Sequence, residues 1–300
     1  MDDLELRELR YFIAVAEELN FTRAAERLGM AQPPLSAAIR KVERKLGVAL
    51  FERTSRQVSL THAGEVLLDQ ARIVVEAANA AVQRTMRAGT TDRLNIAVKP
   101  GTDTELLRAL VRRYAEDPHR PDVELLFGHP GGPAAAVRGG VADVAVLHAP
   151  FDRRGLDSEL LLVEPRVAVL PADHRLAHRR ELCRADLDGE PMPRWTGHTD
   201  AAAAAYWTGS DQPVPAGDGP RINDMNQLLD AVALGNVVAY VPAAIARQHA
   251  RDSLVFVPVT DLSPSELMVA WPSASRSPVV AEFVRTAVTL ASTPLIMVQR

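Results

Sequence analysis

Cationic side chains gather between residues 21 and 60, where they could neutralise phosphate groups. This stretch holds eight basic and three acidic residues, although the whole chain has a net charge of −4. Residues 1–90 carry 13 basic and 12 acidic side chains, and the remaining residues carry 21 and 26. The charge is therefore +1 in the first part and −5 in the second. A basic segment at one end of an acidic chain indicates a nucleic-acid-binding module.

One predicted helix places several of these cations on a single face. It begins at Gln32, because Pro33 and Pro34 are tolerated only in the first turn of a helix. At about 100° per residue, an apolar stripe lies opposite a small and cationic face. The stripe is Leu35, Ile39, Val42 and Leu46, and the opposite face holds Pro33, Ala37, Arg40 and Arg44, with Lys41 at its edge and Ser36 at its side. Small residues followed by arginines suit a DNA major groove, where base edges are approached closely and cations reach phosphates. The alternative is a cationic face that is only solvated.

Two shorter helices precede this one. Residues 4–19 have apolar residues at helical spacing, and Thr22 is expected to cap a second helix that runs to Leu28. Gly29 then suits the left-handed conformation in which helices commonly end. A short helix, a glycine turn and a longer helix form the helix-turn-helix pattern.

Residues 48–60 follow the third helix and contain two short apolar stretches around a polar tip. This pattern predicts a β-hairpin, which would form a wing beside the helices. Arg53 and Arg56 are placed in it to meet the DNA backbone or the minor groove.

Several short runs of residues carry a family resemblance. They are Leu9-Arg10-Tyr11-Phe12, Asn20-Phe21-Thr22-Arg23-Ala24-Ala25, Ala31-Gln32-Pro33-Pro34-Leu35-Ser36 and Leu50-Phe51-Glu52-Arg53. In this order and spacing they resemble the N-terminal winged helix-turn-helix module of LysR-type transcriptional regulators. The resemblance implies contacts with double-stranded DNA from the third helix and the wing, to which we add the start of the second helix. We assign these contacts to Thr22, Arg23, Gln32, Pro33, Pro34, Ser36, Ala37, Arg40, Arg53, Thr54 and Arg56.

Ala37 departs from the family pattern, because many members carry Arg at this position. The substitution removes a donor for guanine or phosphate and leaves an apolar surface that could touch a thymine methyl. The operator preference of relatives therefore does not transfer to this chain.

Residues 62–88 contain no proline and predict one long helix, capped by Thr61. Its apolar residues lie near heptad spacing, which favours a helix that pairs two chains. We assign the pairing to Leu67, Val74, Ala77 and Ala81. The alternative is an ordinary amphipathic helix that packs on its own domain. The resemblance implies a dimer or a dimer of dimers on a partly palindromic promoter site.

From Arg93 onward, strands and helices alternate, which predicts an α/β fold with a largely parallel sheet. The predicted strands are 94–98, 123–127, 143–147, 167–170, 191–195, 237–241 and 267–271, and the helices are 102–114, 133–138, 224–234 and 279–290. The resemblance implies two lobes, as in periplasmic solute-binding proteins, with chain crossings near Leu162–Arg166 and Ser263–Glu266. The expected domains are a DNA-binding domain at 1–60, a linker at 61–91 and an effector-binding domain at 92–300, with lobe I at 92–162 and 267–300 and lobe II at 163–266.

A small-molecule effector is expected where strands end and helices begin, between the lobes. The residues selected by this rule are Lys99, Gly101, Thr102, His129, Pro130, Thr196 and Asn223. Thr102 at a helix start with Lys99 nearby suits an anion, above all a carboxylate. The alternative is that Lys99 and His129 are merely solvated, and Trp195 is expected in the core rather than at a ligand.

No motif points to catalysis or a bound cofactor. The chain has no glycine-rich phosphate loop and no nucleophile elbow, and it contains a single cysteine, Cys183. His174 and His178 have the spacing of metal ligands on a helix, but no third ligand is suggested. Without an apolar run of eighteen residues or a secretory signal, we expect a cytoplasmic protein with no membrane partner. The alternatives are an α/β enzyme or a solute-binding module with no DNA role; the latter leaves the helix-turn-helix unexplained.

Overall fold

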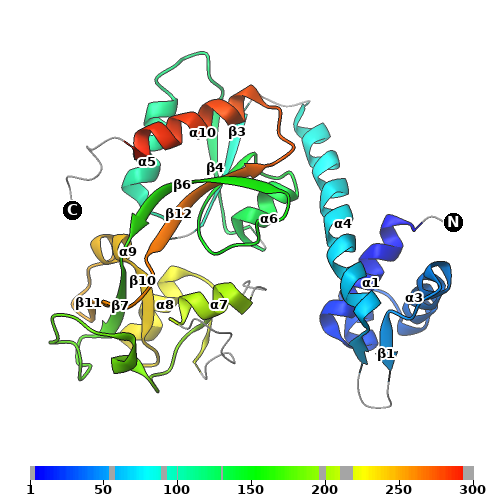
Figure 1. Cartoon of the computed structure of the whole chain (residues 1–300), viewed down its shortest axis with the longest axis horizontal. Coiled ribbons are helices and arrows are strands. Elements are labelled where there is room, and N and C mark those ends of the chain that lie inside the picture. The colour runs from blue at the N-terminus through cyan, green and yellow to red at the C-terminus, as the bar shows by residue number, and fades with distance from the viewer. Residues whose placement is uncertain are drawn as a thin grey trace. The chain divides into compact units, whose positions relative to one another are not determined.

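The computed structural model describes residues 4–53, 58–88, 93–99, 101–129, 131–195, 201–209 and 219–292. The chain divides into two compact units, Met1–Met86 and Arg87–Arg300, and each has a hydrophobic core of its own (Figure 1). No helix in the described ranges is long and apolar enough to cross a membrane.

The N-terminal unit is a helix-turn-helix with a hairpin. Its elements are α1 Leu6–Glu18, α2 Phe21–Arg27, α3 Gln32–Leu46, β1 Phe51–Arg53, β2 Val58–Leu60 and α4 His62–Ala88. The prediction that Thr22 caps α2 is wrong, because Asn20 is the cap. Its side-chain oxygen accepts hydrogen bonds from the backbone amides of Thr22 at 2.9 Å and Arg23 at 3.1 Å. Gly29 has φ +64°, as its predicted place after the helix requires.

The helices of this unit enclose an aromatic and aliphatic core. Phe12 and Phe51 lie with their ring centroids 5.4 Å apart, and Phe21 packs edge-on against Phe51. The stripe of α3 contributes Leu35, Ile39 and Val42, all fully buried. Leu46, the fourth predicted member, is 40% exposed because it is the last residue of α3.

A buried carboxylate joins α1 to α3. Glu8 is 4% exposed and receives Lys45 Nζ at 2.8 Å and Lys41 Nζ at 3.0 Å. Burial alone would raise the pKa of Glu8, but hydrogen bonds from Lys45, the Glu5 amide and Lys41 lower it to about 2. The charge is therefore retained inside the unit because it is paired there.

One face of α4 packs on the helix-turn-helix. Gly64 and Ala71 are buried, and a Cβ at Gly64 would meet the carbonyl oxygen of Leu50 at 2.2 Å. Arg72 pairs with Glu17 at 2.9 Å on the same side. On other faces, apolar side chains stay exposed: Val66, Ile73, Val74, Val82 and Met86.

The C-terminal unit contains two sheets, which are the lobes. The first has five strands in the order β4 Asp122–Phe127, β3 Arg93–Val98, β5 Val144–His148, β12 Ser265–Pro272 and β6 Leu156–Glu164. The expectation of a largely parallel sheet needs correction. β3 pairs in parallel with β4 and β5, but β12 runs antiparallel to both β5 and β6. The antiparallel pair arises because β6 leaves the lobe and β12 returns to it.

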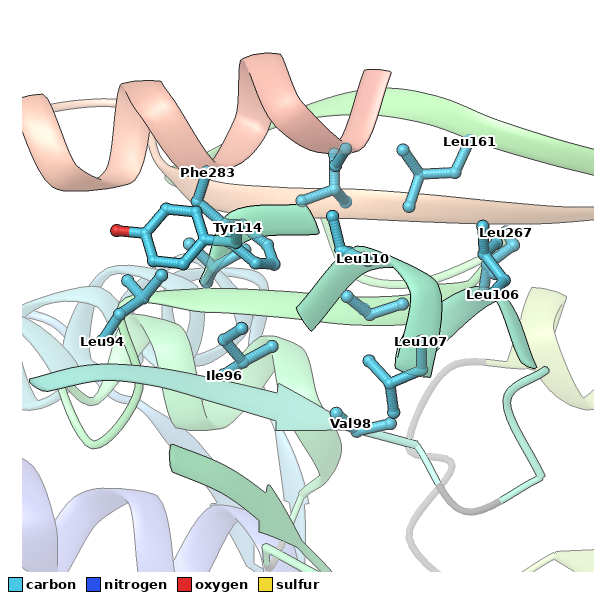
Figure 2. Packing of buried hydrophobic residues seen from close by; sticks show 14 of the residues in the cluster. Leu94, Ile96, Val98, Leu106, Leu107, Leu110, Tyr114, Leu161, Leu267 and Phe283 are labelled. Atoms are coloured by element: carbon cyan, nitrogen blue, oxygen red, sulfur yellow. The ribbon is translucent and has the colours of Figure 1, made fainter. Parts of the chain in front are cut away.

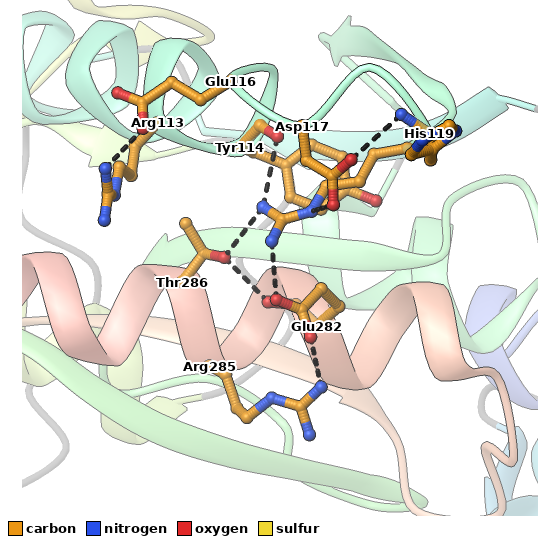
Figure 3. A network of polar contacts seen from close by, with 9 residues as sticks. Arg113, Tyr114, Glu116, Asp117, His119, Glu282, Arg285 and Thr286 are labelled. Carbon is orange, nitrogen blue, oxygen red and sulfur yellow. Dashed lines mark hydrogen bonds and ion pairs between the residues drawn. The ribbon is translucent and has the colours of Figure 1, made fainter.

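Helices cover both faces of this sheet. The helices α5 Thr104–Tyr114 and α10 Pro278–Ala291 pack on one face, and α6 Gly132–Arg138 packs on the other. Figure 2 shows Phe283 of α10 beside Tyr114 of α5, above the side chains of Leu94 and Ile96. Arg120 ties the same helices together, donating to Glu282 at 2.7 Å within the polar network of Figure 3.

The second lobe is built on an antiparallel sheet in the order β10 Ala239–Pro242, β7 Arg166–Pro171 and β11 Leu254–Pro258. The helices α8 Met225–Ala233 and α9 Ala243–Gln248 pack on one face. The predicted strand at 191–195 is only β8 Arg194–Trp195, which pairs with β9 Arg221–Ile222 outside the sheet. Helix α7 Ala201–Trp207 was not predicted.

The chain passes between the lobes twice, at neighbouring points. The first passage lies between Glu164 and Arg166, inside the predicted segment, and the second lies between Pro258 and Ser265. Ser265 pairs with Glu164 across the sheet, so both passages meet at one edge of the lobes.

We predict that Glu8→Gln lowers the free energy of unfolding of the N-terminal unit by about 3 kcal/mol, because Lys45 then lacks its buried counter-charge. Amide hydrogen exchange in α1 and α3 of the full chain measures this loss. Glu26→Gln, at an exposed position of α2, is the control and should change little. Equal protection in both variants would contradict a stabilising role for the pair.

The same carboxylate makes the unit sensitive to acid. Because the folded pKa of Glu8 lies below its usual 4.5, its contribution is complete above about pH 4.5 and is lost as the pH falls towards 2. Glu8→Gln should flatten the acid limb of the stability curve for the N-terminal unit. An unchanged acid limb in the variant would assign the acid sensitivity to other groups.

Candidate functional site

The exposed face of α3 forms one candidate surface. Its members are Gln32, Pro33, Pro34, Ala37, Arg40 and Arg44, and all of them are exposed. The first turn of the helix contains two prolines, and the arginines lie in later turns of the same helix. The structure therefore brings the predicted small and cationic residues together on one side of the unit.

Ser36 departs from this arrangement, because its side chain is buried. Only 7% of the residue is exposed, and its hydroxyl accepts a hydrogen bond from Gln32 Nε2 at 2.8 Å. Gln32 is exposed, and this bond holds its amide against the helix. Of the two side chains, Gln32 is the one available at the surface.

The cations of this unit differ in their partners. Lys41 and Lys45 are held by Glu8, and Arg23 donates to the Glu18 carbonyl at 2.7 Å. Arg40 and Arg44 have no ion pair within the described ranges, so their charges are fully available to an external anion.

The wing forms as predicted, although its tip is outside the described residues. Phe51 pairs with Leu60 and Arg53 with Val58 in an antiparallel ladder. The predicted contacts Thr54 and Arg56 lie at the tip and are therefore not placed, and only the backbone of Arg53 is described.

A second candidate site is a cavity of about 480 Å³ between the lobes of the C-terminal unit. It collects residues from the ends of β3, β4 and β5 in one lobe and from α7, α8 and β10 in the other. Of the predicted effector contacts, Lys99, Gly101, His129 and Asn223 line this cavity. Pro130 and Thr196 lie outside the described residues.

Thr102 is also predicted at this site, but it does not line the cavity. It is 3% exposed, and its hydroxyl donates to the Lys99 carbonyl at 2.7 Å. The helix that follows is capped by Asp103, which accepts from the amides of Glu105 and Leu106. The expected anion site at this helix start is therefore already occupied by a carboxylate of the chain.

Gly101 lies against side chains of the other lobe. Its φ is +89°, and a Cβ there would lie 3.1 Å from Met225 Cε and 3.3 Å from Ile245 Cδ1 of the other lobe. Both the backbone conformation and the space therefore require glycine.

Lys99 gives the cavity its uncompensated positive charge. Its Nζ lies 4.8 Å from the ring centroid of Trp207, a cation–π contact, and it has no ion pair within the described part of the chain. Burial lowers the pKa of Lys99 to about 8. Arg138, a second cation of the wall, already pairs with Asp152. Its guanidinium donates to the Asp152 backbone carbonyl at 2.9 Å and lies 3.5 Å from the Asp152 carboxylate.

A buried histidine of this wall lies beside a buried glutamate. His148 and Glu164 are 5% and 4% exposed, and His148 Nε2 lies 3.9 Å from Glu164 Oε1. Burial lowers the pKa of His148, an effect that Glu164 partly opposes and the Lys99 charge reinforces. The other oxygen of Glu164 accepts from the Ala244 amide at 2.7 Å, so this carboxylate bridges the lobes.

Several cavity residues were not selected from the sequence. They include Arg138, His148, Phe151, Asp152, Trp207 and Tyr240. Trp195, expected in the core, lines the cavity as well and also packs against the core of the second lobe. The run His148 to Asp152 directly follows a predicted strand, so the strand-end rule that selected Lys99 and His129 could have found it.

The possible metal ligands His174 and His178 form no metal site in the described ranges, where no group of three His, Cys, Asp or Glu could hold an ion. His174 lies 3.4 Å from Glu190 instead.

Two family models match this chain. One, for the LysR substrate binding domain, matches residues 87–291, and the other, for bacterial regulatory helix-turn-helix proteins of the lysR family, matches residues 6–65. Together they cover both candidate sites.

Similar curated proteins are transcriptional regulators. The Hca operon transcriptional activator HcaR of Escherichia coli K12 is 34% identical over 94% of this chain and 96% of its own length. The regulator CatR of Pseudomonas putida is 33% identical over 92% and 96%. Among solved structures, full-length BenM (TM-score 0.52, 24% identity, 96% of each chain) and full-length CbnR bound to its target DNA (TM-score 0.52, 23% identity, 96% and 100%) share the fold.

Proposed function

The chain belongs to the family of LysR-type transcriptional regulators, and from this premise we propose which of its residues bind DNA, which pair two chains and which bind the effector. It is a DNA-binding regulator with an effector-binding domain. Its relatives of this family are regulators rather than enzymes, and we propose that it has no catalytic role of its own.

The DNA is read by the N-terminal turn of α3. Gln32 is the base-reading side chain, because it is exposed at that turn and can bond both to a base edge and to Ser36. Ser36 acts through Gln32 by fixing its orientation. Pro33, Pro34 and Ala37 leave room for the base edges, and Arg40 binds phosphate.

The remaining predicted contacts bind the phosphate backbone of the DNA. Thr22 and Arg23 lie at the start of α2, which precedes the recognition helix and meets phosphates in this motif. Arg53, Thr54 and Arg56 contribute from the wing, where Arg53 stands at the end of β1. We propose the DNA-binding domain at 1–60, the linker at 61–91 and the effector-binding domain at 92–300.

Pairing of two chains proceeds through α4. One face of α4 packs on its own unit, and yet apolar side chains on its other faces are exposed. These exposed side chains support the proposed pairing. Val74 is 46% exposed, and Ala77 and Ala81 are exposed on the same side. Leu67 contributes less, because it is partly buried against the core of its own unit.

The effector is an anionic small molecule bound between the lobes. The observation that carries this proposal is the Lys99 ammonium, which lines the cavity and has no ion pair in the described part of the chain. A carboxylate would supply the missing counter-charge. Gly101, His129 and Asn223 line the same cavity, and Pro130 and Thr196 belong to its neighbouring loops in the sequence.

Ligand binding regulates the chain by favouring one arrangement of the lobes. Only a difference in affinity between two arrangements can shift their populations. The contacts that respond are those joining the lobes, such as Glu164 to Ala244 and Arg247 to Asp103 at 3.4 Å. By linkage, DNA then changes the effector affinity by the same factor.

We predict that Gln32→Ala weakens binding to the operator about tenfold or more, because a well-made base contact is worth about 1–3 kcal/mol. Binding to random DNA should not change. Arg40→Ala is the matched comparison and should weaken both DNAs by the same factor, since a phosphate contact carries no sequence information. Fluorescence anisotropy with both DNAs measures these effects, and an equal loss on both DNAs for Gln32→Ala would remove its reading role.

We predict that Val74→Asp shifts the full-length protein toward smaller species, because it places an unpaired carboxylate in the apolar stripe. Gln83→Asp, nine residues further and on the opposite face of α4, should leave the mass unchanged. Light scattering at micromolar concentration compares the two variants. If Val74→Asp kept the wild-type mass, the pairing surface would lie elsewhere.

We predict that a panel of small mono- and dicarboxylates contains members that raise the melting temperature of the wild type by mass action. Lys99→Met should lose most of this shift, because the counter-charge is gone. Lys41→Met is the control, since Lys41 lies in the other unit. A carboxylate that stabilises wild type and Lys99→Met equally binds outside the cavity and contradicts the assignment.

A further inference from the structure

The chain uses lysine at only three positions, Lys41, Lys45 and Lys99, among 34 basic residues. Two of the three amines have an evident structural task, because both contact the buried Glu8. Lys99 has no carboxylate partner in the described ranges and lies in the wall of the cavity. Its task must therefore concern something that enters the cavity.

An amine differs from a guanidinium in one chemical respect that matters here. Arginine stays protonated in proteins, whereas a lysine in an apolar site can lose its proton and become a nucleophile. Lys99 lies against the ring of Trp207, and the cavity that it lines also contains the rings of Trp195 and Phe151. Burial lowers the pKa of Lys99 to about 8, so that about a quarter of its side chains are neutral at pH 7.5, against about one in a thousand for an ordinary lysine.

The titratable and charged groups that share this wall are His129, Arg138, His148, Asp152, Asp224 and Tyr240. None of their carboxylates forms an ion pair with Lys99, since Asp152 binds Arg138 and Arg154, and Asp224 caps α8. His148 packs edge-on against the indole of Trp207, with a centroid distance of 6.0 Å, while the Lys99 ammonium lies against the same ring. The amine thus lies against one face of an indole and forms no ion pair with a carboxylate within the described residues.

We propose that Lys99 captures a carbonyl-bearing effector, an aldehyde or a 2-oxo acid, as a covalent imine. The Nζ lone pair attacks the carbonyl carbon, and one amine proton passes to the carbonyl oxygen to give a carbinolamine. The carbinolamine loses its hydroxyl with a second proton as water, and a C=N bond replaces C=O. No oxidant or reductant is needed, and hydrolysis reverses the capture.

This inference rests on the proposed effector role of the cavity and narrows the ligand class. A 2-oxo acid satisfies both proposals, because the imine is protonated and keeps a positive charge beside the carboxylate. Plain carboxylates would bind to the ammonium alone and would leave no covalent product. The two modes of binding therefore differ in a way that can be measured.

The test treats the full-length protein with glyoxylate and sodium cyanoborohydride, which converts an imine to a stable carboxymethyl-lysine. Peptide mass mapping then follows the three lysines separately. Glyoxylate is small enough to enter the cavity whatever side chain the natural effector carries. We expect modification of Lys99 to be at least about tenfold faster than that of Lys41 at pH 7.5, because far more of its amine is neutral.

The pH dependence provides a second readout. The rate at Lys99 should level off just above pH 8, whereas the rate at a lysine with the ordinary pKa would still rise. Glycolate, which has a hydroxyl in place of the carbonyl, should slow the reaction at Lys99 by competing for the cavity without forming a product. Modification of Lys99 at or below the rate of Lys41 overturns the proposal.

Lys99→Arg separates this inference from the proposed effector site. The variant retains a cation but cannot form an imine, so glycolate and other carboxylates should still raise its melting temperature. If carboxylates stabilise both proteins and Lys99 is not trapped, the cavity is an anion site and covalent capture is wrong. If neither carboxylates nor glyoxylate act on the wild type, the effector site itself is wrong.

Discussion

The antiparallel pairing of β6 with β12 is the constraint on which the effector-binding domain depends. Both strands begin or end at the passage between the lobes, and their register places Ser265 opposite Glu164. This pairing holds two separate cores at a common edge, one under α5 and α10 and the other under α8 and α9. The cavity forms where the ends of the remaining strands meet across that edge. The pairing of β6 with β12 involves none of the residues that line the cavity, and the neighbouring pairing of β12 with β5 involves only Leu147 and His148 among them.

At this edge, buried acidic and basic side chains form hydrogen bonds to the segments that pass between the lobes. Glu164 accepts from the first turn of α9, and Arg166, two residues on, donates to the Ser263 carbonyl at 2.7 Å and to its hydroxyl at 3.0 Å. Both passages between the lobes are thus fixed by a buried acidic and a buried basic side chain with hydrogen-bond partners. Lys99 is the exception, because its contact is an aromatic ring rather than an anion. For this reason we expect a ligand to bind at Lys99 in the cavity rather than at the passages between the lobes.

Sequence reasoning succeeded where structure is local and failed where it is not. The start of α3 follows from Pro33 and Pro34, and the end of α2 follows from Gly29, since each depends on backbone preferences of the residue itself. Strand β6 was not predicted because a β-bulge opposite Leu267 and Met268 shifts its register and breaks the alternation that marks a strand. Thr102 was assigned to the ligand because two possible caps, Thr102 and Asp103, are adjacent, and only the structure shows which one bonds the helix. His148 and Trp207 belong to different lobes, and nothing in the linear chain states that they meet at Lys99.

The ion pairs of Glu8 also bear on how the protein responds to ionic strength. Cations that bind DNA phosphates displace the small ions condensed on the duplex, and the number displaced sets how steeply affinity falls as salt rises. Lys41 and Lys45 already have a counter-charge within the domain, so they displace fewer ions than their position on α3 suggests. The number of basic residues in this segment therefore overstates the positive charge that is left for an external anion. The same carboxylate that holds α1 to α3 thereby lowers the net positive charge that this helix presents.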